Sequence, residues 1–379
     1  MTLESVTKNN PMKSWVVDSS KKFIPSLDGI RGIAILMVLC THFFVFRQAH
    51  SLHSAILGAL SRSGWIGVRL FFVLSGYLIA LGINNSKFFK ARVYISRRAG
   101  KIIPPFYLSA LVACILLIFR NKHSFDYIIS FFQTISFIFV IKTPSPIIDD
   151  IYWSLGAESV FYLFAPISIL LLRRSTKHFS LLLASFLFIF IGNISAIYFS
   201  KLPDFPISTR LLGSFTYFGF GIFIAFLRSH FSPSRKMAIV LGSIGILLFM
   251  AIYLGVGTYT AMLPWAQAGD FCAALNESIL FPNLLALSAA LFVIGSLESD
   301  WWLPRILSIR PLVFLGIVSY EWYLFHLIFG DLFGIGHANG SLINFVAAPI
   351  LSAVFSLIFA TLVYRYMSLP ILRLVHLVK

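Results

Sequence analysis

Two residues that could take part in chemistry lie in one apolar segment near the start of the chain. Arg31 and His42 are eleven residues apart in the stretch 27–42. In an α-helix, eleven steps of about 100° return to within roughly 20° of the starting direction, so both side chains face the same way. At a rise of about 1.5 Å per residue, they lie roughly 16 Å apart along the axis. Ionisable groups at membrane depth are costly and mark functional sites, which makes Arg31 and His42 candidate functional residues. The alternative is that Arg31 anchors the helix at the headgroups and His42 only hydrogen-bonds to a neighbouring helix.

A second polar stripe lies in a later apolar segment. Ser154, Glu158 and Tyr162 follow the i, i+4, i+8 spacing that puts side chains on one helix face. Because a carboxylate can orient an imidazole and stabilise its protonated form, we expect Glu158 to lie near His42 and support it as a base. The alternative is that Glu158 only hydrogen-bonds to a helix end.

A third stripe consists of Ser319, Tyr323 and His326, at i, i+4 and i+7. His326 is the second imidazole expected at membrane depth, so it is a candidate catalytic residue as well. A packing role for His326 is the alternative.

Two basic residues, Arg98 and Lys101, lie three positions apart and share a helix face. A guanidinium offers bidentate contacts to phosphate, and an ammonium offers a point charge. The pair is therefore a candidate phosphate-binding site, with ordinary loop charge as the alternative.

The elements that position these residues must be membrane helices. Of the 379 residues, 58% are hydrophobic and only 12% are charged, and the mean hydropathy is +0.88. Repeated apolar runs long enough to span lipid predict an all-α, polytopic membrane protein. Ten spans are expected, centred on residues 30–46, 64–83, 102–119, 153–172, 179–198, 211–227, 237–255, 277–296, 312–331 and 342–363.

The segment 126–141 is too short and polar to be an evident span, and we expect it to be re-entrant. If it does not cross, most of the 30 lysines and arginines fall on one side, whereas a crossing would divide them almost evenly. The positive-inside rule therefore favours ten spans with both termini cytoplasmic, in the cell (inner) membrane.

Composition also excludes several classes of function. The formal net charge of +16 suits anionic lipids and soluble anions, but no soluble basic domain is present that would read nucleic acid. The three cysteines have unrelated spacings and predict neither a disulfide framework nor a metal site. We expect a polar cytoplasmic tail at 1–22, a transmembrane domain at 23–372 and no appended soluble domain.

Together these segments resemble the acyltransferase-3 family of integral membrane O-acyltransferases. The matching pieces are Leu27-Asp28-Gly29-Ile30-Arg31-Gly32 with His42, the run 70–79, Arg97-Arg98 with Lys101 and Pro104, Trp153-Ser154-Leu155 with Glu158 and Tyr162, and Ser319-Tyr320 with Tyr323 and His326. They occur in the family's order over residues 24–370.

The resemblance implies transfer of an acyl group, most often acetyl from acetyl-CoA, to a hydroxyl of a surface or lipid-linked glycan. Arg98 and Lys101, with Arg31, would bind the phosphates of the donor. His42 would be the general base, Glu158 would orient it, and His326 would polarise the thioester or place the acceptor. No metal is implied, and the chain would act alone or with a separate extracytoplasmic partner, where some relatives carry an esterase-like domain.

The chain departs from the family pattern at three positions. Arg69 stands where an Asp is usual, Ser159 replaces a second Glu, and Lys101 replaces the more usual Arg. The first change reverses a charge, and the last loses the bidentate fork. A competing hypothesis is a proton-coupled transporter or flippase of a lipid-linked glycan or organic anion, with His42 and Glu158 as the proton relay.

Overall fold

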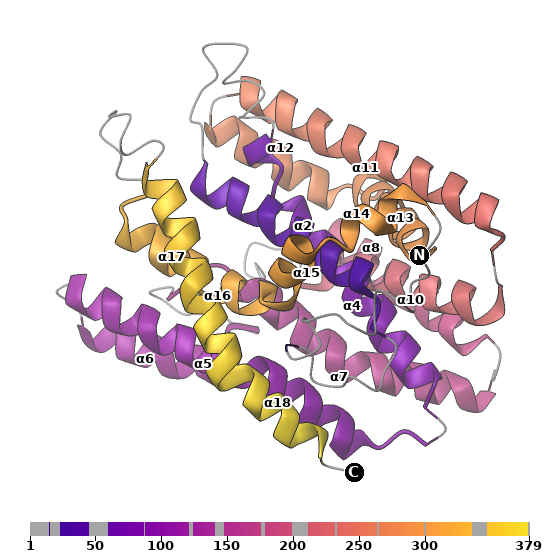
Figure 1. Ribbon diagram of the computed structural model, residues 1–379, viewed down its shortest axis with the longest axis horizontal. Helices are drawn as coiled ribbons and strands as arrows, with labels where there is room; N and C mark the ends of the chain where they lie inside the picture. The colour runs from indigo at the N-terminus through magenta and orange to yellow at the C-terminus, as the bar shows by residue number, and fades with distance from the viewer. Residues whose placement is uncertain are drawn as a thin grey trace.

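The computed structural model describes residues 15, 23–44, 60–86, 88–120, 124–140, 148–175, 179–198, 211–231, 233–263, 265–298, 301–335 and 347–377. Every regular element in these ranges is helical, which confirms the expected all-α class (Figure 1). The α-helices are α2 (Pro25–Phe43), α4 (Ile66–Asn84), α5 (Ala91–Arg120), α6 (Ser124–Ile135), α7 (Tyr152–Ser175), α8 (Ser180–Tyr198), α10 (Phe215–His230), α11 (Arg235–Met262), α12 (Trp265–Glu277), α13 (Leu280–Ser296), α14 (Trp302–Leu307), α15 (Arg310–Ile317), α16 (Ser319–Leu332), α17 (Ala348–Val363) and α18 (Leu369–His376). A 3₁₀ turn, η2 (Ile138–Val140), and a π-helical turn, η5 (Tyr364–Ser368), complete the list.

Eight of the described helical segments are long and apolar enough to cross a membrane. The pair α15 and α16 adds a ninth segment that is bent by 75° at its break. The predicted span at 277–296 corresponds to α13, an apolar helix of 17 residues. The multi-pass architecture is thus confirmed, while the count of ten and the cytoplasmic termini stay predictions. Apart from Trp15, the predicted tail 1–22 lies outside the described residues.

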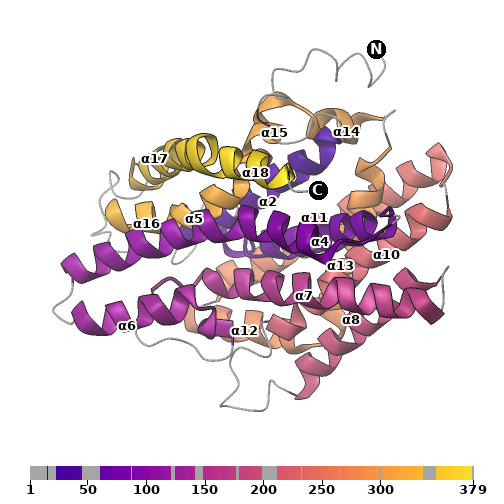
Figure 2. The ribbon, with the colours of Figure 1, turned by 90° about the horizontal axis from the view of Figure 1, so that it is seen from below.

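The segment predicted to be re-entrant forms the 12-residue helix α6 followed by η2. At about 1.5 Å per residue α6 is only about 18 Å long, shorter than a bilayer core of about 30 Å. It turns back beside α5, as Figure 2 shows, and the Tyr107 hydroxyl donates to the Ile135 carbonyl over 3.1 Å. The Phe106 and Phe137 ring centroids are 5.2 Å apart. The described part of the segment, α6 with η2, therefore ends beside the middle of α5. Residue 141 lies outside the described residues.

Helix α2 lies against α14 and α15 because two of its positions carry no side chain. A Cβ at Gly29 would lie 1.8 Å from the Leu307 carbonyl oxygen, and one at Gly32 would lie 2.3 Å from the Leu312 carbonyl oxygen. Only glycine permits this backbone approach, which is typical of small residues between membrane helices. This contact holds the turn of α2 that carries Arg31 against α14 and α15.

Helix α16 starts after the break at Val318 and packs against both α2 and α17. The Trp322 indole N–H donates to the Ser356 hydroxyl of α17 over 2.9 Å. This bond fixes the rotation of α16 about its axis, and it leaves Tyr323 and His326 to face the neighbouring helices.

Candidate functional site

A pair of histidines joins α2 to α16. The Nε2 atom of His326 lies 2.9 Å from the Nδ1 atom of His42, and their ring centroids are 4.8 Å apart. His326 is fully buried, with 0% of its surface exposed. Its Nδ1 atom lies 2.6 Å from the backbone carbonyl oxygen of Tyr323. The structure thus brings together the two imidazoles that the sequence predicted to be functional.

The hydrogen-bond partners assign a tautomer to each ring. The Tyr323 carbonyl only accepts hydrogen bonds, so Nδ1 of His326 must donate to it. In the neutral ring, Nε2 of His326 then carries a lone pair and accepts from Nδ1 of His42. This chain of bonds leaves the lone pair of His42 on its Nε2 atom. A histidine held in this way is suited to take up a proton.

The predicted cations Arg31, Arg98 and Lys101 line one cavity of about 630 Å³. Arg31 pairs with Asp28 one turn earlier, with Nη1 3.3 Å from Oδ1. The guanidinium of Arg98 lies over the ring of Tyr162, 5.2 Å from its centroid. We call this space the basic cavity. It is wide enough to hold a phosphate-bearing ligand against several cations.

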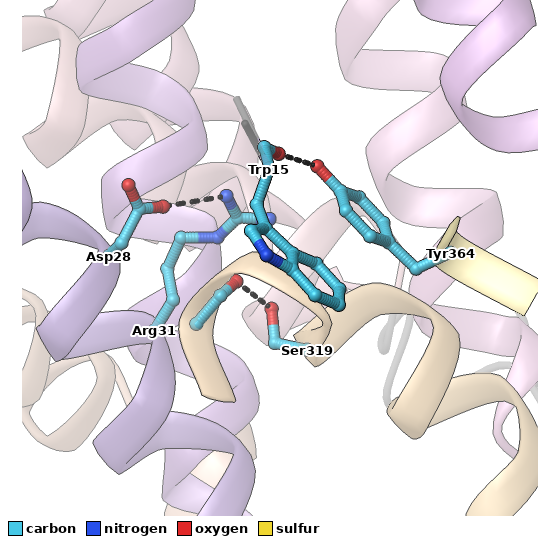
Figure 3. A network of polar contacts seen from close by, with 6 residues as sticks. Trp15, Asp28, Arg31, Ser319 and Tyr364 are labelled. Carbon is cyan, nitrogen blue, oxygen red and sulfur yellow. Dashed lines mark hydrogen bonds and ion pairs between the residues drawn. The ribbon is translucent and has the colours of Figure 1, made fainter. Parts of the chain in front are cut away.

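Aromatic residues form part of the wall of the basic cavity near Arg31 (Figure 3). Trp15 stacks on Tyr364, with ring centroids 6.2 Å apart and planes 4° apart, and the Tyr364 hydroxyl donates to the Trp15 carbonyl. Ser319 lies nearby and donates to the Gly316 carbonyl at the break before α16. Both aromatic residues were missed by the sequence analysis, which contains no signal that brings position 15 to position 364.

Glu158 does not lie where the sequence predicted. One of its carboxylate oxygens accepts hydrogen bonds from Ser75, over 2.7 Å, and from Tyr162. The Tyr94 hydroxyl donates to the Tyr162 carbonyl over 3.0 Å, which sets this turn of α7 against the start of α5. Because α7 packs in that register, Glu158 lies level with the cations, and the predicted contact with His42 is wrong.

A smaller cavity of about 100 Å³ shares lining residues with the basic cavity and reaches Tyr323, which lies one turn before His326 on α16. Arg31, Arg98 and Lys101 line both cavities, and Glu158, Ser154 and Tyr323 line the smaller one. The Ser154 and Tyr323 hydroxyls are 2.8 Å apart. We call this space the narrow cavity. The predicted stripe Ser154, Glu158 and Tyr162 does share one face of α7, and it runs along this cavity.

A third cavity, of about 250 Å³, lies farther along α16, where Leu327 lines it, whereas Tyr323, one turn earlier, lines the narrow cavity. Its polar lining consists of His42, Arg120, Asp149 and Asp331, and we call it the distal cavity. Burial raises the pKa of the Asp149 carboxyl to about 7, and the nearby carboxylates of Asp150 and Asp331 add to that shift. Asp149 could not be predicted from the sequence, because a short segment between helices carries no periodic pattern.

The unusual cation Arg69 is buried among aromatic rings. Its guanidinium carbon lies 5.1 Å from the ring centroid of Tyr217 and 5.2 Å from that of Trp153, and Nη1 donates to the Ser214 hydroxyl over 3.1 Å. Cation–π contacts of this kind stabilise a charge that would otherwise be costly at this depth. Among the residues with described positions, no group of three His, Cys, Asp or Glu could hold a metal ion.

Comparison with known proteins gives one family. A family model described as an acyltransferase domain matches residues 24–365. A Staphylococcus aureus protein named "Putative O-acetyltransferase" is 27% identical, over 95% of this chain and 59% of the relative. Peptidoglycan O-acetyltransferase OatA of Listeria monocytogenes is 26% identical, over 81% of this chain and 49% of the relative. The chain thus spans about half to three fifths of the length of these relatives. No solved structure matches the chain.

Proposed function

We propose that this chain, which belongs to the family defined by that acyltransferase domain, is a membrane O-acetyltransferase that moves acetyl from acetyl-CoA to a glycan hydroxyl. The observation that carries the proposal is the contact between His42 and His326, because His326 lies on α16 between Tyr323, which lines the narrow cavity, and Leu327, which lines the distal cavity. The names of the relatives support the acetyl group, and the Listeria relative suggests a cell-wall glycan as acceptor.

The basic cavity suits the donor. Three cations that share one cavity wall match the phosphates of coenzyme A, with Arg98 able to bind two oxygens and Lys101 acting as a point charge. The narrow cavity would admit the thioester end of the donor toward Tyr323 and the histidines. Glu158 would then balance the charge of the cations, since it lines the narrow cavity beside them.

His42 would act as the general base. Its Nε2 atom would take the proton of the acceptor hydroxyl while the hydroxyl oxygen attacks the thioester carbonyl carbon. The carbon–sulfur bond then breaks, and the departing thiolate takes the proton back from His42. His326 would position His42, because both of its own ring nitrogens are already engaged in hydrogen bonds.

We also propose that the basic cavity opens to the cytoplasm. Coenzyme A thioesters are cytoplasmic, and lysine and arginine collect on the cytoplasmic side of membrane proteins. Because α18 ends beside the first turns of α5, a reporter fused after the last residue should then read as cytoplasmic. A reporter that reads as external would invert the donor and acceptor sides.

The proposal is tested with purified protein in lipid nanodiscs, acetyl-labelled acetyl-CoA and peptidoglycan glycan strands. Wild-type protein should release free CoA thiol and leave base-labile labelled acetyl on the glycan. His42→Ala should lose both signals. His230→Ala is the matched control, since that residue hydrogen-bonds to the Phe226 carbonyl on α10, away from the three cavities. Full activity of His42→Ala would refute the assignment, and glycan movement without thiol release would favour the transporter hypothesis.

A further inference from the structure

The distal cavity lies between the end of α2, the end of α5, α16 and the segment before α7. Its wall is largely apolar, with Leu116, Ile148 and Leu327 among the lining residues. His42 reaches the same cavity. A ligand held here would therefore lie against aliphatic side chains and within reach of the proposed base.

In the distal cavity, Arg120 is paired with one acid, Asp331, and the second acid, Asp149, is not paired with it. Arg120 is engaged twice by Asp331: Nη1 lies 2.8 Å from Oδ2, and Nη2 donates to the backbone carbonyl over 2.7 Å. Asp149 accepts a hydrogen bond from the Ile151 amide over 3.2 Å. Within the described ranges, no lysine or arginine lies within ion-pair distance of Asp149. The one cation among the described lining residues is therefore already paired, and the Asp149 carboxyl is available to a ligand.

We propose that the distal cavity binds a sugar that carries no negative charge, and that Asp149 anchors it by accepting a hydrogen bond from a hydroxyl beside the one that reacts. This inference rests on the proposed function and deepens it, because it names the class of acceptor. Above its pKa of about 7, the Asp149 carboxylate can bind sugar hydroxyls through short, charge-assisted hydrogen bonds. The apolar wall suits the C–H faces of a pyranose ring.

The described lining residues of this cavity act against an anionic acceptor. A uronic acid or phosphate placed beside Asp149 would meet two carboxylates, and the Arg120 guanidinium is held by one of them. Like charges at close range in a partly buried site act against binding. Burial raises the pKa of Asp149 and the Asp150 and Asp331 carboxylates add to the shift, so above pH 7 the ionised carboxyl adds to the repulsion of an anion.

The experiment measures CoA thiol release from acetyl-CoA in nanodiscs with two soluble acceptors of matched length, an N-acetylchitotetraose and a tetragalacturonate. The neutral oligosaccharide should stimulate release and become acetylated, and the uronate should do neither. Asp149→Ala should raise the KM for the neutral oligosaccharide roughly tenfold or more, because a charge-assisted hydrogen bond is lost. Asp149→Asn, which keeps a carbonyl acceptor, should have a smaller effect. The KM for acetyl-CoA should be unchanged in both variants.

The matched control is Asp126→Asn, which changes an exposed acid at the start of α6 and should leave both KM values unchanged. Acetylation of the uronate as fast as the neutral sugar, transfer to neither sugar, or an unchanged acceptor KM in Asp149→Ala would overturn this proposal. The proposed function itself would fail differently. In that case acetyl-CoA would not be consumed with any acceptor, glycan strands included, or consumption would be the same in wild type and His42→Ala.

Discussion

The basic cavity and the distal cavity differ in charge, yet the same helix reaches both. Arg31, near the start of α2, lines the basic cavity with Arg98 and Lys101. His42, near the end of α2, lines the distal cavity with Asp149. The rise of about 1.5 Å per residue sets these two α2 residues roughly 16 Å apart. One rigid helix can therefore hold a cation and an imidazole at a constant separation. The proposed acyl transfer requires this, because donor and acceptor would enter from opposite ends.

The two cavities also differ in how their polar groups are used. In the basic cavity the cations exceed the carboxylates, so the wall favours an anion. In the distal cavity the described charged residues are either paired with each other or negative. The wall of this cavity therefore disfavours an anion. Under the proposed function, this difference would sort donor and acceptor by charge before they meet at the histidine pair.

The largest expected effect on activity comes from substitutions in the histidine pair. His42→Ala should lower kcat by about 10²–10⁴, the usual contribution of a general base. His326→Ala should cost less, because His326 positions the base without touching the acceptor. The double variant should be no slower than His42→Ala, since a positioning residue has no effect once the base is gone. Thiol release at saturating donor and acceptor measures all three.

The pH profile distinguishes positioning from simple packing. Without its hydrogen bond to His326, the His42 ring loses the partner that fixes its tautomer, so the profile of His326→Ala should shift relative to wild type. His326→Gln, which can restore an acceptor for His42, should recover part of the activity. A profile of unchanged shape in His326→Ala, with no recovery in His326→Gln, would assign His326 to packing alone.

The next effect separates the donor side from the acceptor side. Arg98→Ala and Lys101→Ala should each raise the KM for acetyl-CoA by roughly tenfold or more, because each removes a charged contact to phosphate. The acceptor KM should not change, since neither residue lines the distal cavity. Lys101→Arg should be tolerated, because it keeps the positive charge. An equal loss of kcat with unchanged donor KM would give these residues a structural role.

A smaller effect tests the corrected place of Glu158. Glu158→Gln should change the KM for acetyl-CoA about fivefold, which is the effect expected when one modest electrostatic contact is lost. It should not change the pH profile that reports His42, because the two residues make no described contact with each other. A shifted profile with an unaltered donor KM would return Glu158 to the role that the sequence predicted.

Periodicity and composition were enough to predict the helical class and several of the residues that line the cavities. Arg31 and His42 lie on a stripe of one helix, and the eleven-residue spacing determines their separation. Arg98 and Lys101 were likewise predicted to share a face, and they line the same cavity. These predictions succeeded because each one concerns a single helix, whose geometry follows from the chain alone.

The contacts between helices could not be predicted in the same way. His42 meets His326 across 284 positions of sequence, and Glu158 meets Ser75 and not His42. Such registers depend on backbone approaches like that of Gly29 to the Leu307 carbonyl, which no pattern within one segment reveals. The role predicted for Glu158 was wrong because depth along a helix does not determine which neighbour a side chain faces.

The smallest expected effect concerns the distal cavity and the pH dependence of stability. The folded protein holds Asp149 at a pKa of about 7, above its ordinary value of 3.8, and Asp150, Asp331, Arg120 and His42 are the charged or titratable groups around it. Between these two pH values the folded state binds a proton that the unfolded state has released. The stability that this proton contributes is complete below pH 3.8 and is lost as the pH rises through 7.

Asp149→Asn removes this titrating group, so the stability of the variant relative to wild type should increase as the pH rises. We expect its thermal midpoint in detergent to exceed that of wild type by roughly 2–4 °C at pH 8, with a smaller difference at pH 5. Asp126→Asn should follow wild type at both values, since that side chain is exposed. Parallel curves for wild type and Asp149→Asn across this range would mean that Asp149 is ordinarily solvated. The distal cavity would then lack the buried carboxyl on which its contrast with the basic cavity depends.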